Sequence, residues 1–221
     1  MYVRDSMTID PICISVDTKV SHALDIMETN GFHRLPIVDE DGKLIGLITE
    51  GIIKENSSSK ATSLTVHELN YLLSKLEVGD LMIKKVVSID PEALLEKAAT
   101  SMRSHNIGCL PVLEDGRVIG IITNNDIFDA FINLLGYNVD GSRYVVNVAN
   151  DSAGIMAKIS KCFADRQINI TNISTYYGPR GIEIIIITKD KDTLMMKQAL
   201  TDIGVDVVQA DDTEELRGDR G

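Results

Sequence analysis

The chain has 221 residues, of which 44% are hydrophobic and 25% are charged, and its formal net charge is −11. This composition excludes disordered and fibrous proteins, and no run of about 20 apolar residues is present to cross a bilayer. The negative charge argues against a protein that wraps nucleic acid through electrostatic attraction, because neutralising phosphates needs clustered Lys and Arg.

An internal repeat occupies the first part of the chain. The segment 27–49 matches the segment 102–123, and both contain Leu-Pro, Asp-Gly and Gly-x-Ile-Thr. Asp-Gly between apolar runs is a strong hairpin signal, because glycine accepts a positive φ without steric cost. We therefore predict a two-stranded hairpin in each copy.

Other elements flank each predicted hairpin. A short β-branched strand is predicted at 12–16 and at 86–89. A helix follows each strand, because apolar residues recur three and four positions apart. A second helix closes each copy and is clearest at 124–135.

The segment between the copies changes character along its length. Residues 55–63 are polar and lack periodicity, which is typical of a linker. Thr65 and Glu68 then form a capping-box pattern ahead of leucines at helical spacing. We predict a helix that packs against one of the copies; a helix that binds a partner is the alternative.

The pattern changes again after Gly141. The predicted elements are a strand, a helix, two strands, a helix and a strand, at 144–148, 153–166, 168–177, 181–188, 190–203 and 205–210. The order βαββαβ is that of the ferredoxin-like fold, which packs two helices on one face of an antiparallel sheet. Residues 211–221 are charged and lack periodicity, so we expect a mobile acidic tail.

The repeated half resembles a pair of cystathionine-β-synthase (CBS) domains, known as a Bateman module. The motifs that carry the resemblance are Met7 and Met82 near the start of each copy, LPIVDEDG and LPVLEDG in the hairpins, and GLIT and GIIT before the last helix. The resemblance implies that the two CBS domains pack as a pseudo-twofold pair.

The C-terminal part resembles an ACT domain, a small regulatory module that binds small ligands. The sequence NDSAGI at 150–155 stands where that family has its ligand loop, although Ala153 replaces the usual proline. Two CBS domains followed by one ACT domain are similar to the AcuB-type acetoin-utilization proteins.

These resemblances imply a mixed fold, α+β or α/β, with the CBS pair followed by a ferredoxin-like βαββαβ ACT domain. The expected parts are CBS domain 1 at 1–55, a linker with a helix at 56–77, CBS domain 2 at 78–137, the ACT domain at 143–210 and the acidic tail at 211–221.

The CBS resemblance implies an adenine nucleotide as the ligand: AMP, ATP, NAD or cyclic di-AMP. The family's motif G-h-h-T-x-x-D is present as Gly120 to Asp126, with Thr123 at its centre. A threonine hydroxyl and unpaired helix N–H groups can receive a phosphate, and a carboxylate can accept hydrogen bonds from a ribose diol. In the first copy, Ile52 stands in place of the carboxylate and offers no acceptor.

A second asymmetry lies in His33 and Arg34, which resemble a pair that contacts phosphates in some nucleotide-binding CBS proteins. In that family the pair faces the cleft that holds the other copy's carboxylate. We therefore expect one competent site and one degenerate site, the latter around Thr49 and Ile52. The competent site is expected to contain Thr123, Asp126, His33 and Arg34, with backbone from Lys84–Val87, and so Lys85 and Val87.

These residues also have purely structural interpretations. Thr123 can cap a helix, and Asp126 can complement its dipole in the first turn. His33 and Arg34 can form a solvated strand edge, and Ile52 can be a core residue.

The ACT resemblance implies a small ligand, often an amino acid, at an interface between two such domains. Asp151, Gly154 and Asn169 occupy the matching positions. Glycine permits close approach of the backbone, and asparagine supplies a donor and an acceptor to a zwitterion. The alternatives are that Asp151 only caps the following helix and that the domain only dimerises.

The sequence contains no pattern typical of an enzyme or a metal site. Nucleophile-elbow, dinucleotide and P-loop motifs are absent, and the three cysteines and four histidines show no metal-ligand spacing. The start of the chain shows no signal or transit peptide, so we expect a cytoplasmic location.

The function expected from these observations is that of a regulatory sensor. We expect a homodimer that binds an adenine nucleotide, and an amino acid at the ACT domain, and that passes the change to an unknown protein partner. The alternative is a ligand-independent dimerising scaffold. A third interpretation, a hydrolase of acetoin breakdown, rests on the family label alone.

Overall fold

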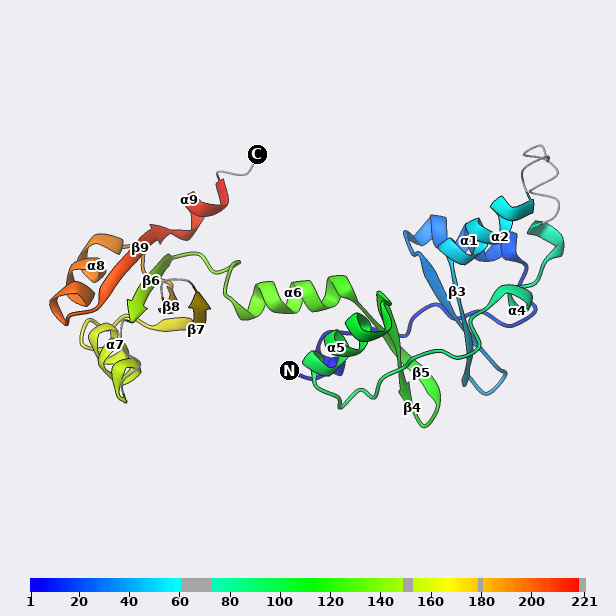
Figure 1. The fold of residues 1–221 in the computed structure, drawn as a ribbon, viewed down its shortest axis with the longest axis horizontal. Helices are drawn as coiled ribbons and strands as arrows, with labels where there is room; N and C mark the ends of the chain where they lie inside the picture. Colours follow the sequence, from blue (N-terminus) through cyan, green and yellow to red (C-terminus); the bar gives the residue numbers. More distant parts are fainter. Residues whose placement is uncertain (61–72, 149–152, 179–180, 219–221) are drawn as a thin grey trace. The chain divides into compact units, whose positions relative to one another are not determined.

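The computed structural model describes residues 1–60, 73–148, 153–178 and 181–218 of the chain. They form two compact units, Met1–Ile127 and Phe128–Gly221. The boundary lies inside helix α6 (Asn124–Leu134), which is drawn in green in Figure 1. It therefore falls earlier than the end of CBS domain 2 expected at residue 137.

The N-terminal unit contains the two predicted hairpins. In the first, Pro36 pairs with Leu47, and in the second Pro111 pairs with Ile121. The turns place Gly42 and Gly116 at φ values of 78° and 80°, where a side chain would be strained. The strands are β2 (Arg34–Val38), β3 (Leu44–Thr49), β4 (Cys109–Glu114) and β5 (Arg117–Thr123).

Helices precede and follow each hairpin, as the periodicity predicts. Each preceding helix turns its apolar stripe inward, with Val20, Ala23 and Met27 buried in the first copy. The helices are α1 (Val20–Asn30) and α2 (Glu50–Lys60) in the first copy, and α5 (Leu95–His105) and the start of α6 in the second; the short helix α4 (Val78–Leu81) precedes the second copy.

The short strands predicted at 12–16 and 86–89 are wrong as strands. Only single parallel bridges form there, between Ile14 and Ile37 and between Ile89 and Val112. The physical reason is that each segment is extended and lies along the hairpin of its own copy, but only one of its residues, Ile14 or Ile89, exchanges backbone hydrogen bonds with that hairpin.

The two copies are joined by an exchange of segments, in which each copy pairs with a segment that precedes the other. The N-terminal strand β1 (Thr8–Ile9) pairs with β5 of the second copy, through Thr8 and Ile121. In the opposite direction, Ile83 forms an antiparallel bridge with Leu47 of the first copy. Each copy is therefore completed by a segment that precedes the other in sequence.

The linker helix predicted from Thr65 onward lies largely outside the described residues. Its C-terminal end is described: Leu73 is buried in the core of the first copy, and Leu76 packs against the same core. The apolar stripe packs there against the first copy, as predicted.

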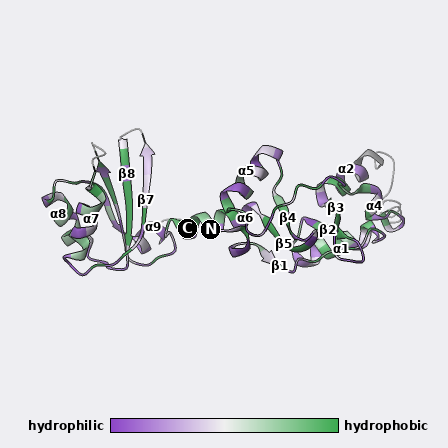
Figure 2. Cartoon of the chain, turned by 90° about the horizontal axis from the view of Figure 1, so that it is seen from below, coloured by the Kyte–Doolittle hydropathy of each residue, from purple (hydrophilic) through white to green (hydrophobic). Residues whose placement is uncertain are grey.

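The C-terminal unit has the predicted element order βαββαβ. Its antiparallel sheet has the strand order β7-β8-β6-β9, which is the ferredoxin-like order. Both main helices lie on one side of the sheet in Figures 1 and 2, and β8 is coloured largely as hydrophobic in Figure 2. The elements are β6 (Ser142–Val148), α7 (Ile155–Ala164), β7 (Ile170–Gly178), β8 (Gly181–Thr188), α8 (Thr193–Asp202) and β9 (Asp206–Asp212).

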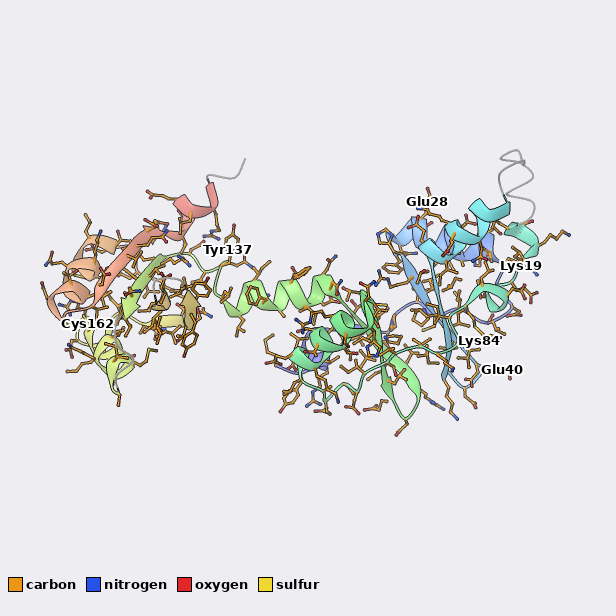
Figure 3. The ribbon with its side chains drawn as sticks, viewed as in Figure 1. Lys19, Glu28, Glu40, Lys84, Tyr137 and Cys162 are labelled. Carbon is orange, nitrogen blue, oxygen red and sulfur yellow. The ribbon has the colours of Figure 1, made fainter. Side chains whose placement is uncertain are left out.

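The core of this unit lies between the sheet and the two helices. Tyr144 of β6 and Phe163 of α7 are fully buried and meet edge to face, with ring centroids 5.6 Å apart. Cys162, labelled on α7 in Figure 3, is buried beside them.

The expectation of a mobile tail from residue 211 is wrong over most of its length. Strand β9 continues to Asp212, and helix α9 (Thr213–Gly218) follows. The helix is held by an ion pair of 2.8 Å between Lys191 and Glu214 and by another between Arg217 and Asp140. Residues 219–221 lie outside the described part. No helix among the described residues is long and apolar enough to span a membrane.

Candidate functional site

Two clefts open in the N-terminal unit, and residues of both copies line each of them. The first, here called the Thr123 cleft, has a volume of about 370 Å³ and is lined by Thr8, Pro11, Ile12, Gly31, Phe32, His33, Arg34, Leu35, Gly108, Ile121, Thr123, Asn124 and Asn125. The second, the Thr49 cleft, has a volume of about 390 Å³ and is lined by His33, Arg34, Leu47, Thr49, Glu50, Gly51, Ile83, Lys85, Val86, Val87, Asn106, Ile107, Gly108 and Cys109. Of the residues expected in one site, Thr123, His33 and Arg34 line the Thr123 cleft, whereas Asp126 does not line it.

The structure groups Lys85 and Val87 differently from the expectation. They line the Thr49 cleft, whereas Pro11 and Ile12 line the Thr123 cleft. The exchange of segments is the reason: residues 10–13 run from β5 of the second copy to the first, and residues 84–88 run from the first copy to the second. Each crossing segment therefore lines the cleft formed at the Thr of the opposite copy.

Thr123 and Asp126 are bonded to each other at the start of α6. The Thr123 backbone N–H and hydroxyl both donate to Asp126 Oδ2, each over 2.7 Å. In return, the Asp126 N–H donates to the Thr123 hydroxyl oxygen over 3.4 Å. This is a helix cap, as the structural interpretation of these residues expects, and Asp126 Oδ1 makes no further hydrogen bond within the described residues.

The first copy keeps only half of this arrangement. The Ile52 N–H donates to the Thr49 hydroxyl over 3.2 Å, so Thr49 caps α2. Ile52 is half-buried and packs against the core of the first copy. No carboxylate stands at this position, so the Thr49 cleft lacks an equivalent of Asp126.

His33 contacts Glu50, which lines the Thr49 cleft. Its Nδ1 atom is 3.0 Å from Glu50 Oε2, and its side chain is 73% exposed. Lys54 also pairs with Glu50. Hydrogen bonds from Lys54 and, secondly, from His33 lower the pKa of the Glu50 carboxyl below its usual value. Glu50 therefore stays negatively charged beside the candidate phosphate-binding histidine.

Arg34 lies between the two clefts and lines both of them. A Cβ atom built on Gly108 would lie 3.0 Å from Arg34 Nη1, so the guanidinium lies directly against this glycine. Burial raises the pKa of the neighbouring Cys109 thiol, and Arg34 opposes that effect. Because Gly108 is the counterpart of His33 in the second copy, the missing side chain there leaves room for Arg34.

The charges at the two helix starts differ. Glu50 follows Thr49 as the first residue of α2, whereas Asn124 follows Thr123 as the first residue of α6. A carboxylate at this place repels an incoming phosphate, while an amide does not. The Thr123 cleft is therefore the better anion site.

Sequence reasoning missed the apolar walls of the Thr123 cleft. Ile12 and Phe32 line it and are 41% and 40% exposed. An exposed aromatic ring beside an aliphatic side chain provides a surface for a planar base. The signal available was the position of Phe32 directly before His33.

The predicted ACT ligand residues are only partly described. Asp151 lies outside the described residues. Gly154 has a φ of 92° at the start of α7, and a Cβ atom built on it would meet no atom within 4 Å. Asn169 is exposed just before β7. Gly154 directly precedes α7, and Asn169 lies between α7 and β7.

Comparison with known families identifies the repeated half. The CBS domain model matches residues 3–58 and 78–133, which confirms the predicted pair. A CBS domain-containing protein of Dictyostelium discoideum is 33% identical over 60% of this chain and 92% of its own length. A homoserine O-acetyltransferase of Methanohalobium evestigatum is 34% identical over 57% of this chain, but the match spans only 23% of that enzyme.

Solved structures with the same fold match the same half. A Vibrio cholerae protein assigned to acetoin utilization (AcuB) has a TM-score of 0.53 and 29% identity, over 62% of this chain and 95% of that one. The CBS pair of protein MJ0100, solved with 5′-methylthioadenosine and S-adenosyl-L-methionine, has a TM-score of 0.52 and 28% identity, over 60% and 97%. CBSX2 in complex with AMP has a TM-score of 0.51 and 26% identity, over 60% and 97%.

Proposed function

Since this chain belongs to the CBS domain family, we propose that it is a regulatory protein whose N-terminal unit binds one adenine nucleotide in the Thr123 cleft. The observation that carries the proposal is that Thr123, His33 and Arg34 line a single cavity beside the start of α6. Similar CBS pairs have been solved with AMP and with S-adenosyl-L-methionine, which supports adenine-bearing ligands as the class.

Each part of a nucleotide has a matching group in this cleft or next to it, since Asp126 does not line the cleft but is bonded to Thr123, which does. Ile12 and Phe32 offer an apolar surface to the base. Asp126 Oδ1 can accept hydrogen bonds from a ribose diol while Oδ2 keeps its bonds to Thr123. Arg34 supplies a guanidinium for a phosphate, which it can bind through two parallel hydrogen bonds.

We propose one nucleotide per chain, because the Thr49 cleft is poorly suited to an anion. Ile52 replaces the carboxylate that would hold the ribose, and Glu50 places a negative charge near the phosphate position. Lys85 lines the Thr49 cleft and partly balances that charge, but its side chain does not reproduce a ribose acceptor.

For the C-terminal unit we propose the role of an ACT domain. The ferredoxin-like strand order supports this assignment, and an amino acid near Asp151, Gly154 and Asn169 is its proposed ligand. We further propose that the protein acts as a homodimer, regulates a protein partner and serves acetoin utilization, the last on the likeness to the Vibrio cholerae protein.

Calorimetric titration of the full-length protein with AMP, ATP, NAD and cyclic di-AMP tests the proposal. The variant is Asp126→Ala, and the matched control is Asp129→Ala, which removes an exposed carboxylate from the same helix. We expect one site per chain that is lost in the first variant and kept in the second. If none of the four nucleotides binds, the proposal is wrong, and the dimerising scaffold becomes the better description.

A further inference from the structure

A separate cavity of about 360 Å³ lies on the second face of the C-terminal sheet. Neighbouring residues of a strand point to opposite faces, and Tyr144 and Val146 face the helices. Arg143, with its cross-strand partner Ile187, therefore lies on the other face, as does Ile185. These three side chains line the cavity, so α7 and α8 take no part in it.

The walls of the cavity are two segments outside the βαββαβ core. One is α9, through Leu216 and Arg217. The other is the segment 135–137, whose Tyr137 is labelled in Figure 3 on the chain between α6 and β6. Residues 135–137 were expected to end CBS domain 2, and α9 was expected to belong to the mobile tail, yet both line the cavity on the sheet.

The segment 135–137 is held in place by β7. The Asn172 side-chain amide donates to the Leu134 carbonyl oxygen over 2.8 Å. Gly136 has a φ of 71°, and a Cβ atom built on it would lie only 2.7 Å from Asn172 Oδ1. The wall of the cavity is thus fixed by a hydrogen bond and by a glycine that this close approach requires.

Arg143 is a charged group of the cavity that forms no ion pair within the described residues. The Nη1 atom of its side chain donates to Gln209 Oε1 over 3.3 Å. The Arg143 side chain makes no other hydrogen bond or ion pair within the described part of the chain. Arg217, in contrast, is paired with Asp140. The Gln209 side-chain amide also donates to Asp211 Oδ2.

Arg143 stays charged although it is half-buried. Burial lowers the pKa of its guanidinium, and the carboxylates of Asp211 and Glu183 oppose this effect. A guanidinium remains protonated under any ordinary condition. Four of its five N–H groups therefore point to no protein acceptor in the described residues, beside the apolar side chains of Ile185 and Ile187.

We propose that this cavity binds a small monocarboxylate with a compact apolar body. The fork of a guanidinium matches the two oxygens of a carboxylate, and this pair gains strength where water is excluded. The apolar floor of Ile185 and Ile187 favours a hydrocarbon body and disfavours a strongly hydrated polyanion. This site is independent of the nucleotide proposed for the N-terminal unit.

Methyl NMR of the full-length protein with labelled isoleucine tests the site. The probes are isovalerate and benzoate, and the matched neutral probes are isovaleramide and benzamide, which keep the shape and lose the charge. We expect saturable shifts of the Ile185 and Ile187 methyl signals, with the acids binding at least about tenfold more tightly than the amides.

Two variants connect the binding to Arg143. Arg143→Gln should weaken isovalerate binding by at least about tenfold, because the charge is lost while a hydrogen-bonding side chain remains. Arg166→Gln is the control, since Arg166 follows α7 and bonds the Cys162 carbonyl oxygen instead. An unchanged signal of the core residue Ile159 verifies that each variant is folded.

Several results would overturn the proposal. They are an absence of shifts at Ile185 and Ile187 at millimolar probe, equal binding of acids and amides, or unaltered binding by Arg143→Gln. If Arg143→Gln does not fold, Leu216→Glu replaces it, because a carboxylate on that wall should repel the probe, and unaltered binding would again contradict the site. A parallel titration with AMP reports on the N-terminal unit alone, so failure of one proposal is distinguishable from failure of the other.

Discussion

Asp126 Oδ2 accepts hydrogen bonds from both the N–H and the hydroxyl of Thr123, at 2.7 Å each, and leaves Oδ1 on the same carboxylate for a ligand. One side chain thus combines a helix cap with a candidate ribose acceptor. The structural and functional interpretations of this residue are compatible, because they use different oxygens.

Asp126→Asn separates the two roles of this carboxylate. An asparagine retains one acceptor oxygen, so it can keep the bonds to Thr123, but its other atom becomes a donor and cannot accept from a ribose. We expect Asp126→Ala to lower the free energy of unfolding by about 1 kcal/mol. We expect Asp126→Asn to lower it less, whereas both variants lose nucleotide affinity. Urea unfolding and calorimetry measure the two effects, and retained affinity in Asp126→Asn would contradict the ribose role.

Glu50 is expected to weaken phosphate binding in the wild-type protein. Its carboxylate lies 3.0 Å from His33 and is kept ionised by Lys54 and His33. We expect Glu50→Gln to raise the affinity for AMP by no more than a few-fold, because water screens the interaction between solvated groups. The gain should shrink at high salt, as expected for screened charges.

The control for this change is Glu55→Gln on the same helix. It alters the net charge equally but does not line either cleft. If both variants raise the affinity to the same extent, the effect is that of net charge, and the specific role of Glu50 is contradicted.

Local patterns predicted most of the elements, but they did not predict which segments complete which copy. Asp-Gly turns and helical spacing identified the hairpins and helices, because these signals depend on neighbours in sequence. The pairing of Thr8 with Ile121 and of Ile83 with Leu47 depends on the packing of the two copies. For this reason Lys85 and Val87 were assigned to the wrong cleft.

The site and the tail show the same limit. That Thr123, His33 and Arg34 line one cleft was predictable from the resemblance of the repeats to a CBS pair. Phe32 was missed because a single exposed aromatic residue has no pattern of its own. Helix α9 was missed because a short charged segment gains its stability from partners distant in sequence, such as Lys191 and Asp140.

The exchanged segments explain two glycines in the repeated motif. A Cβ atom built on Gly120 would lie 2.5 Å from Met7 Sδ and 3.0 Å from the Thr8 carbonyl oxygen. The same relationship joins Gly46 to Met82, whose Sδ atom is the atom nearest to a Cβ built on Gly46. The glycine of each copy therefore leaves room for the methionine that precedes the other copy.

Gly120→Ala should be destabilising by about 1–3 kcal/mol, since the new methyl group overpacks this contact. Met7→Ala removes the nearest obstacle, so the double variant should be less destabilised than the sum of the two single changes. Urea unfolding of the four proteins gives the interaction energy between the two sites. Strict additivity would show that Met7 is not the group that requires Gly120.

Thr213 joins the start of α9 to the start of β6. It is buried, its hydroxyl oxygen accepts from the Gly141 N–H over 2.9 Å, and the hydroxyl donates to the Gly141 carbonyl oxygen over 3.2 Å. Thr213→Val keeps the shape but leaves the buried Gly141 N–H without its acceptor. We expect a loss of about 1–3 kcal/mol in the stability of the C-terminal unit.

The control is Thr213→Ser, which keeps the hydroxyl and should therefore retain most of that stability. Hydrogen exchange at the Gly141 amide measures the effect locally. Protection in the valine variant as high as in the serine variant would contradict the role of the hydroxyl hydrogen bonds, and higher protection would mean that methyl packing holds α9 to the sheet.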